Sequence, residues 1–282
     1  MGRTVTPGTA RRDLPALRRS FQADGFCVAP PVLPAALLDD AVAGVDAVVG
    51  GDYETGLPPR LRQWSPGDDP EGLIKVAEPH VANRAIYSLV THPALGRLAA
   101  DIVDAEMLQV WAVDLFVKLP SRADRANVGW HQDAAYAPYW EGDVFTVWVP
   151  LSGVSGDSAP LRYVPGSHRL PLLPGGDLFE VDLEGMRHRL DLPAGFVWDE
   201  VRAAVPRGGF ALHHRRTLHA SGPNLAREPR RALAVRLRTE RCRLVHADAR
   251  PAVVEHLDDP TRAPVLYPPP GGRRSKGSAR GG

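Results

Sequence analysis

The chain has 282 residues, and its 34 Lys and Arg nearly balance its 33 Asp and Glu, which leaves a formal charge of +1. That balance argues against a nucleic-acid partner, because nucleic-acid-binding proteins carry a basic excess. No apolar run reaches the roughly 20 residues that span a bilayer, and the N-terminus lacks the apolar stretch of a secretory signal. Two cysteines, Cys27 and Cys242, cannot build a disulfide framework. We therefore expect a cytoplasmic protein with no membrane partner.

The first third of the chain predicts helices with short strands between them. Residues 1–12 are polar and are expected to be disordered. Beyond them, apolar residues recur at helical spacing or gather in short runs bounded by Gly and Pro. The predicted elements are helices over 14–21, 35–49, 82–90 and 93–103, and strands over 26–29 and 73–76.

An alternation of side chains marks the next segment, 107–119, as a strand. From Trp111 on, its odd-numbered residues are apolar and its even-numbered residues include two charges: Trp111, Val113, Leu115 and Val117 against Asp114, Phe116 and Lys118. One face should therefore pack under helices while the other lines a wet cavity, as in a barrel that encloses a pocket.

The second half of the chain predicts short strands with turns between them, over 144–151, 161–164, 210–214, 217–219 and 230–239. The last of these is the most regular. Arg231, Leu233, Val235 and Leu237 fall on one face, and Arg230, Ala232, Ala234 and Arg236 fall on the other. The second face fits the floor of a polar pocket. We predict a mainly β protein with flanking helices and a double-stranded β-helix (jelly-roll or cupin) core, in one domain over 13–246.

Two segments lack clear periodicity. Residues 170–206 hold several Pro and Gly residues, and a long irregular segment in a compact domain is typically functional, so we predict a mobile lid there. From 247 to 282 the sequence becomes Pro-rich and then rich in Gly, Arg and Ser, which predicts a solvated tail.

A histidine and a carboxylate stand two residues apart in Gly129-Trp130-His131-Gln132-Asp133. In a strand, His131 and Asp133 would project from one face and Gln132 from the other. His219, 88 positions later, can supply a third ligand. Two histidines and one carboxylate form the ligand set of non-haem Fe(II) oxygenases. A His-x-Asp pair alone is more often a polar strand edge, so the interpretation depends on the neighbouring motifs.

Three motifs occur in a fixed order: Trp130-His131-Gln132-Asp133, Pro165-Gly166-Ser167-His168-Arg169 and His219-Ala220-Ser221-Gly222-Pro223-Asn224, the last followed by Arg230. With them the sequence resembles the phytanoyl-CoA dioxygenase family of Fe(II)/2-oxoglutarate oxygenases, over residues 15–240. The resemblance implies the jelly-roll fold, Fe(II) as the metal, and 2-oxoglutarate and O2 as cosubstrates. Halogenating relatives replace the carboxylate ligand with a small residue, so the presence of Asp133 favours oxygenation.

The resemblance also assigns cosubstrate contacts. Arg230, eleven positions after the third ligand, takes the place that binds the distal carboxylate of 2-oxoglutarate, for which a guanidinium is the best partner. The adjacent alternative, Arg231, lies on the apolar face. Lys75 and Trp148 are further implied contacts, with a plain surface or core role as an equal alternative. Ser221 shares a face with the third ligand and can add a hydroxyl.

Several other polar residues near these motifs have more than one interpretation. His168 is interpreted as a turn histidine because the metal triad is already complete. Of His213 and His214, one could donate to a carboxylate that orients the site, and a strand-surface role is at least as plausible. The sequence departs from the family at Gly209, where Asp is common, and at His213 and Arg215, where Phe and Gly are common. These departures bear on the shape of the pocket and not on the metal.

The substrate is expected to be a small molecule. An aromatic cluster that includes Tyr136 and Trp140 follows the first metal motif, and a substrate wall and a packed loop corner are equal interpretations of it. Arg236 could meet an anionic group. The main hypothesis is hydroxylation or another oxidation of a C–H bond in a metabolite, in specialised biosynthesis. Desaturation, epimerisation or ring closure by the same chemistry is the alternative, followed by a non-catalytic jelly-roll binding module. The oligomeric state is left open.

Overall fold

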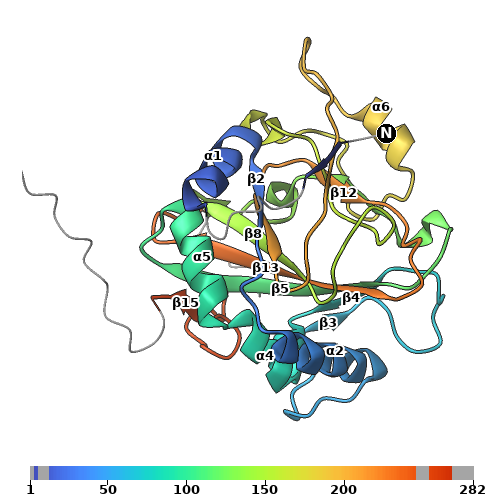
Figure 1. The fold of residues 1–282 in the computed structure, drawn as a ribbon, viewed down its shortest axis with the longest axis vertical. Coiled ribbons are helices and arrows are strands. Elements are labelled where there is room, and N and C mark those ends of the chain that lie inside the picture. Colours follow the sequence, from blue (N-terminus) through green and yellow to red (C-terminus); the bar gives the residue numbers. More distant parts are fainter. Residues whose placement is uncertain (1–2, 6–12, 246–253, 269–282) are drawn as a thin grey trace, which may run out of the picture.

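The computed structural model describes residues 3–5, 13–245 and 254–268. Two main β-sheets form its centre (Figure 1). The eight-stranded sheet contains, in spatial order, β2 (Phe26–Ala29), β11 (Phe210–His214), β8 (Val144–Pro150), β13 (Arg230–Thr239), β5 (Leu108–Lys118), β4 (Ile74–Ala77) and β3 (Leu61–Arg62), with β15 (Val265–Tyr267) also paired to β5. The five-stranded sheet contains β1 (Arg3–Val5), β10 (Val201–Ala203), β9 (Arg162–Tyr163), β12 (His219–Ser221) and β6 (Val128–His131). A small ribbon pairs β7 (Trp140–Glu141) with β14 (Arg243–Leu244).

The helices are α1 (Leu14–Asp24), α2 (Ala35–Gly50), α3 (Pro79–Ala82), α4 (Arg84–Val90), α5 (Pro93–Val103) and α6 (Leu183–Arg189). The side chain of Asp13 caps α1 by accepting from Ala16 N at 3.0 Å, and the helix ends at Gly25, whose φ of 83° suits glycine. Helices α1, α2, α4 and α5 gather along one flank of the molecule, and α6 lies on the opposite side (Figure 1). The elements predicted before residue 105 are confirmed.

The outer face of the large sheet carries the main apolar core. Leu233, Val235 and Leu237 of β13 and Val113 of β5 pack there with buried residues of the helices. Trp111 is an exception to the predicted alternation. The pairing of β5 with β13 shifts between Arg236 and Leu237, and this irregularity turns Trp111 into a separate aromatic cluster. The prediction that Trp111 packs under the helices is therefore wrong.

The inner face of the large sheet packs against the small sheet. Phe116, Trp148 and Ala232 share a buried cluster with Val128 and Tyr163 of the small sheet. Because the inward residues of β13 include alanines, space remains between the two sheets for a cavity. Charged residues at both ends of β13 border this space, as the alternation predicted.

The segment 170–206 is mostly scaffold. It contains α6 and β10, and Met186 and Leu190 pack with Trp130 on the outer side of the small sheet. Of its residues, Leu178 and Phe179 line the two cavities described below, and Leu178 O accepts from Gly129 N at 3.1 Å. A Cβ on Gly129 would lie 2.1 Å from Asp177 O, so this approach requires glycine. Most of the segment therefore has a scaffold role that the prediction did not give it, and its mobility as a lid stays a prediction.

Both predicted ends contain structure. Arg3–Val5 pairs in parallel with β10, so the prediction of disorder over 1–12 is wrong for these residues. The domain also extends past the predicted boundary at 246, since β15 pairs with β5 and the Gln109 side-chain amide donates to Ala263 O at 3.0 Å. The rest of the predicted N-terminal segment and tail, 1–2, 247–253 and 269–282 among them, lies outside the described residues. Cys27 and Cys242 are free thiols.

Across the described ranges, none of the helices combines the length and the apolar character that crossing a membrane requires.

Candidate active site

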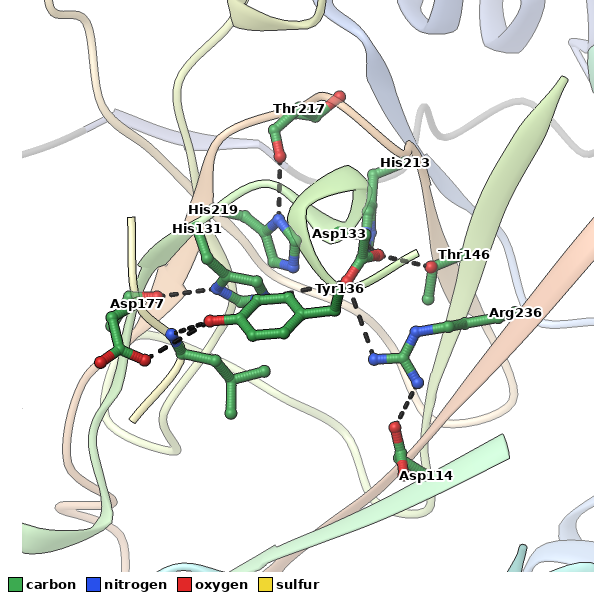
Figure 2. Close-up of polar contacts among 12 residues, drawn as sticks. Asp114, His131, Asp133, Tyr136, Thr146, Asp177, His213, Thr217, His219 and Arg236 are labelled. Carbon is green, nitrogen blue, oxygen red and sulfur yellow. Dashed lines mark hydrogen bonds and ion pairs between the residues drawn. The ribbon is translucent and has the colours of Figure 1, made fainter. Parts of the chain in front are cut away.

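Three predicted metal ligands converge at one edge of the small sheet (Figure 2). His131 ends β6, and His219, at the start of β12, is its direct cross-strand partner. Asp133 lies just past the strand, in a 3-10 turn over Asp133–Tyr136, so it is not on the strand itself as predicted. Gln132 between them keeps an extended backbone (φ −112°, ψ 127°), which preserves the alternation. One ligand atom from each of the three buried side chains lies within 4.8 Å of the others.

Each metal-facing imidazole is held in the tautomer that a metal needs. The Nδ1–H of His131 donates to Gly129 O at 2.8 Å, and that of His219 donates to Thr217 O at 2.9 Å. Both Nε2 atoms therefore keep a free lone pair. Burial lowers the pKa of His131, and burial together with the neighbouring imidazoles lowers the pKa of His219 well below its usual value. Both rings are thus neutral at pH 7, which is the metal-binding form.

Asp133 uses its two oxygens differently. Its Oδ2 accepts from Thr146 Oγ1 at 2.6 Å and from His213 Nε2 at 3.2 Å. Its Oδ1 lies 3.8 Å from His131 Nε2 and faces the other ligands. Burial by itself would raise the pKa of Asp133, but the charge of Arg236 and the hydrogen bond from His213 hold that pKa well below its usual value. Two imidazole nitrogens and one carboxylate oxygen fit a divalent iron ion.

The first cavity, of about 410 Å³, lies beside these ligands and is lined by Arg230, Trp148 and Ser221 as well. Arg230 is 2% exposed, and burial lowers its pKa to about 9, so it stays charged at pH 7. Its guanidinium carbon lies 5.5 Å from the centre of the Trp148 ring, and its Nε has no hydrogen-bond partner in the described part of the chain. Within the described ranges no carboxylate pairs with Arg230. The cavity therefore holds an unmatched positive charge next to the metal ligands.

Lys118 is fully buried beside this cavity, whereas the alternation in 107–119 predicted that it faces water. Its Nζ donates to Ser221 Oγ at 2.7 Å, Ser221 O at 2.9 Å and Gly222 O at 2.8 Å. Because Ser221 Oγ accepts from Lys118, its own hydroxyl hydrogen is free to point into the cavity. Burial, with the nearby charge of Arg230, lowers the pKa of Lys118 well below its usual value.

A second cavity, of about 970 Å³, adjoins the first one, and both are lined by Asp133, Leu178 and Arg236. Lys75 lines this second cavity and is not among the residues that line the first; its Nζ lies 3.2 Å from Asp114 Oδ1. Arg236 donates to the other oxygen of Asp114 and also lies 3.7 Å from Asp133 Oδ1 (Figure 2). Two carboxylates therefore already neutralise Arg236, and a contact between Arg236 and an anionic group of the substrate stays a prediction.

Of the two predicted aromatic contacts, only Tyr136 lines a cavity. Its hydroxyl accepts from Leu178 N at 2.6 Å, and its ring meets His131 edge-on at 5.8 Å between centroids. Trp140 is 3% exposed and packs behind Trp111, because β7 pairs with β14 and turns the ring inward. The other aromatic residues of the cavity wall are Trp111, Tyr139 and Phe179. The bulge in β5 brings Trp111 there, and a bulge leaves no mark in the alternation.

Arg215 and His213, which the sequence analysis singled out as departures from the family pattern, and His168 each have defined contacts. Arg215 donates to Trp140 O and to Ala137 O at 3.1 Å. These bonds fix the loop that follows the 3-10 turn Asp133–Tyr136. His168 packs against Gly25 and His214, in agreement with its interpretation as a turn histidine. His213 is the predicted histidine that donates to a site carboxylate.

A family model of phytanoyl-CoA dioxygenase (PhyH) matches residues 21–232. The chain therefore belongs to the phytanoyl-CoA dioxygenase family, and the resemblance of its motifs is confirmed. A curated relative, the probable alpha-ketoglutarate-dependent hypophosphite dioxygenase of Stutzerimonas stutzeri, is 30% identical over 176 residues. That match covers 60% of this chain and 58% of the relative, so the chain spans less than two thirds of that protein's length.

Solved structures share the fold. The epimerase SnoN, in complex with Fe3+, alpha ketoglutarate and nogalamycin RO, is 23% identical with a TM-score of 0.64, over 87% of this chain and 89% of that chain. The carbocyclase SnoK from nogalamycin biosynthesis is 23% identical with a TM-score of 0.60, over 84% and 87%. AviO1 from Streptomyces viridochromogenes Tue57 is 26% identical with a TM-score of 0.60, over 86% and 100%. These likenesses confirm the predicted jelly-roll core.

Proposed function

We propose that this protein is an Fe(II)- and 2-oxoglutarate-dependent oxygenase that oxidises a C–H bond of a medium-sized, partly apolar small molecule. The observation that carries the proposal is the placement of three metal-ligand atoms and the unmatched Arg230 in one cavity. An unmatched buried charge is costly. A dicarboxylate with a 2-oxoacid end would satisfy both groups at once, since it can chelate a metal at one end and pair with a guanidinium at the other.

Iron held by His131, Asp133 and His219 would supply the activation of O2 that is coupled to oxidative decarboxylation of 2-oxoglutarate. The balance is one C–H substrate, one 2-oxoglutarate and one O2 in, and one alcohol, one succinate and one CO2 out. Arg230 would hold the distal carboxylate with the free hydroxyl hydrogen of Ser221, and Trp148 would cover the guanidinium from water.

The second cavity supports a substrate of metabolite size. It meets the first cavity at Asp133 and Arg236, so a molecule bound there would present its C–H bond to the metal side. Its aromatic walls, Tyr136 among them, suit rings and other apolar faces. The relatives named for nogalamycin biosynthesis support a specialised metabolite as the substrate class.

A second outcome of the same chemistry is epimerisation or ring closure. It is supported by the names of SnoN, an epimerase, and SnoK, a carbocyclase. Both outcomes consume 2-oxoglutarate and O2, and product analysis separates them. A non-catalytic binding module is disfavoured because ligand atoms of His131, Asp133 and His219 lie close together and Arg230 lines the same cavity.

Anaerobic titration of the metal-free protein with Fe(II) tests the proposal, together with a screen for compounds that stimulate succinate release. Replacing His131, Asp133 or His219 with Ala should abolish stoichiometric iron binding and turnover and leave the fold intact, because the ligands line a preformed cavity. His188→Ala, on the exposed face of α6, is the matched control. Stoichiometric binding that survives in the triple variant would contradict the assignment.

A further inference from the structure

Strand β11 ends in two consecutive histidines that face opposite ways. His214 packs against His168 and accepts from Arg216 N at 3.1 Å, on the side away from the metal ligands. His213 is 1% exposed and lines the first cavity. A phenyl ring in its place could make none of the polar contacts that His213 makes.

His213 connects two groups from different strands. Its Nε2 lies 3.2 Å from Asp133 Oδ2, and its Nδ1 lies 2.9 Å from the hydroxyl of Tyr163 on β9. An ionised carboxylate only accepts hydrogen bonds, so Nε2 of His213 carries a proton. In the tautomer protonated on Nε2 alone, Nδ1 is an acceptor, and the Tyr163 hydroxyl donates to it. Tyr163 therefore selects the tautomer in which His213 can donate to Asp133.

The turn that carries Asp133 explains why such support is needed. Asp133 lies beyond the end of β6, so strand pairing does not fix its carboxylate. Thr146 from β8 and His213 from β11 both donate to Oδ2, and Oδ1 lies 3.8 Å from Nε2 of the ligand His131. If both oxygens bound the metal, the protein would fill four of six positions. That would leave two positions for a bidentate 2-oxoacid and O2, which together need three.

We propose that His213, set in its tautomer by Tyr163, is a positioning residue that keeps Asp133 a one-oxygen ligand and so keeps the third position open. The proposal rests on the proposed function, which assigns the three ligands. Residues of this kind, which orient a metal ligand, affect metal affinity by about 10- to 100-fold when they are replaced.

Anaerobic Fe(II) titration, with iron alone as the probe and then with 2-oxoglutarate added, tests the proposal. His213→Phe should weaken iron binding by about 10- to 100-fold, and His213→Gln, whose amide can still donate, should recover part of the loss. Tyr163→Phe should give a smaller loss that disappears in the His213→Phe background, since Tyr163 acts through His213. His214→Phe, the matched neighbour on the other face, should bind iron like the unmodified protein.

The outcomes distinguish a failure of the positioning role of His213 from a failure of the proposed oxygenase function. If the unmodified protein binds no stoichiometric iron, the proposed function fails. If it binds iron and His213→Phe binds equally well with an unchanged 2-oxoglutarate affinity, the positioning role is overturned. Should His213→Phe not fold, Tyr163→Phe removes one oxygen only and decides the matter, because unchanged iron affinity in that variant would refute the selection of the tautomer. A loss in Tyr163→Phe of equal size with and without His213 would refute it too.

Discussion

The two ends of β13 each present an arginine to the interior, and the two arginines have opposite surroundings. Arg236 is matched by Asp114, which also pairs with Lys75, and it approaches Asp133. Arg230 is more deeply buried, has no carboxylate partner among the described residues, and stands directly across from Lys118 on β5. Like charges in that position are destabilising. The charge of Arg236 is thus neutralised by carboxylates of the protein. The charge of Arg230 is left for an anion that binds from outside the chain.

The neighbouring strand β5 produces this difference. Its inward positions run from Asp114 through Phe116 to Lys118, so the charge that faces β13 changes sign along the strand. Asp114 completes the Arg236 end. At the Arg230 end, Phe116 offers only its carbonyl, 3.5 Å from Nη1. Of the two arginines, Arg230 is therefore the better candidate for binding an anionic ligand, because no carboxylate among the described residues neutralises its charge.

The largest effect is expected from Asp114→Ala, which would leave the buried Arg236 and the partly buried Lys75 without their shared partner. Removing one member of a buried ion pair costs about 3–5 kcal/mol of folding stability, and here both Arg236 and Lys75 depend on Asp114. Chemical denaturation measures the loss. Asp143→Ala, which breaks an exposed pair with Arg241, is the control. A loss below that of the control would mean that the Arg236 end is not held by its charges.

Arg230→Met should have the opposite signature. The apo-protein should lose little stability, because the change removes an unmatched charge and keeps most of the volume. Binding of 2-oxoglutarate should weaken by about 2–5 kcal/mol, the range for truncating one partner of a buried charge pair. Calorimetric titration of 2-oxoglutarate, beside denaturation of the apo-protein, measures both. A variant that is strongly destabilised but binds normally would reverse the assignments of the two ends.

Lys75→Met tests whether Lys75 binds the cosubstrate or stabilises the ion pairs of Asp114. The family resemblance implies a cosubstrate contact, whereas its place in the second cavity and its bond to Asp114 put it with Arg236. The expected result is a stability loss of about 1.5–3 kcal/mol, the range for a hydrogen bond between charged groups, and an unchanged affinity for 2-oxoglutarate. If the 2-oxoglutarate affinity fell as far as in Arg230→Met, the family role would hold and the placement by cavity would be wrong.

Regular strands were the most predictable part of the fold. The alternation in 230–239 placed Arg230 and Arg236 on the pocket side and Arg231 on the helix side, because a strand without irregularities keeps a period of two. The same reasoning failed at Trp111, where the shifted pairing with β13 reversed the faces. Whether a strand contains an extra residue depends on its pairing with the neighbouring strand. Here that neighbour, β13, lies more than a hundred residues away in the sequence, so the alternation within β5 could not reveal it.

The candidate site was predictable where short motifs define it. His131, Asp133 and His219 come together as their motifs implied. The burial of Lys118 was missed because a lysine on an inward face is ordinarily interpreted as facing water. Trp140 was misplaced because the pairing of β7 with β14 turns it inward. The segment 170–206 looked aperiodic because it is divided between a two-turn helix, a three-residue strand and loops that each pack on different neighbours.

The smallest effect, and the finest test of the strand faces, is expected from Arg231→Ala. Arg231 forms a two-point pair with Asp46 of α2, at 2.7 and 3.0 Å, on the side opposite to Arg230. Because the Asp46 side chain is 53% exposed, solvent screens the pair, and its loss should cost at most about 1 kcal/mol of stability. The affinity for 2-oxoglutarate should not change, since the helix layer and the first cavity lie on opposite faces of the sheet. Denaturation and calorimetric titration, run beside Arg230→Met, give both values. A greater loss of 2-oxoglutarate binding in Arg231→Ala than in Arg230→Met would shift the face assignment by one residue, and the unmatched charge would then no longer mark the cosubstrate end of β13.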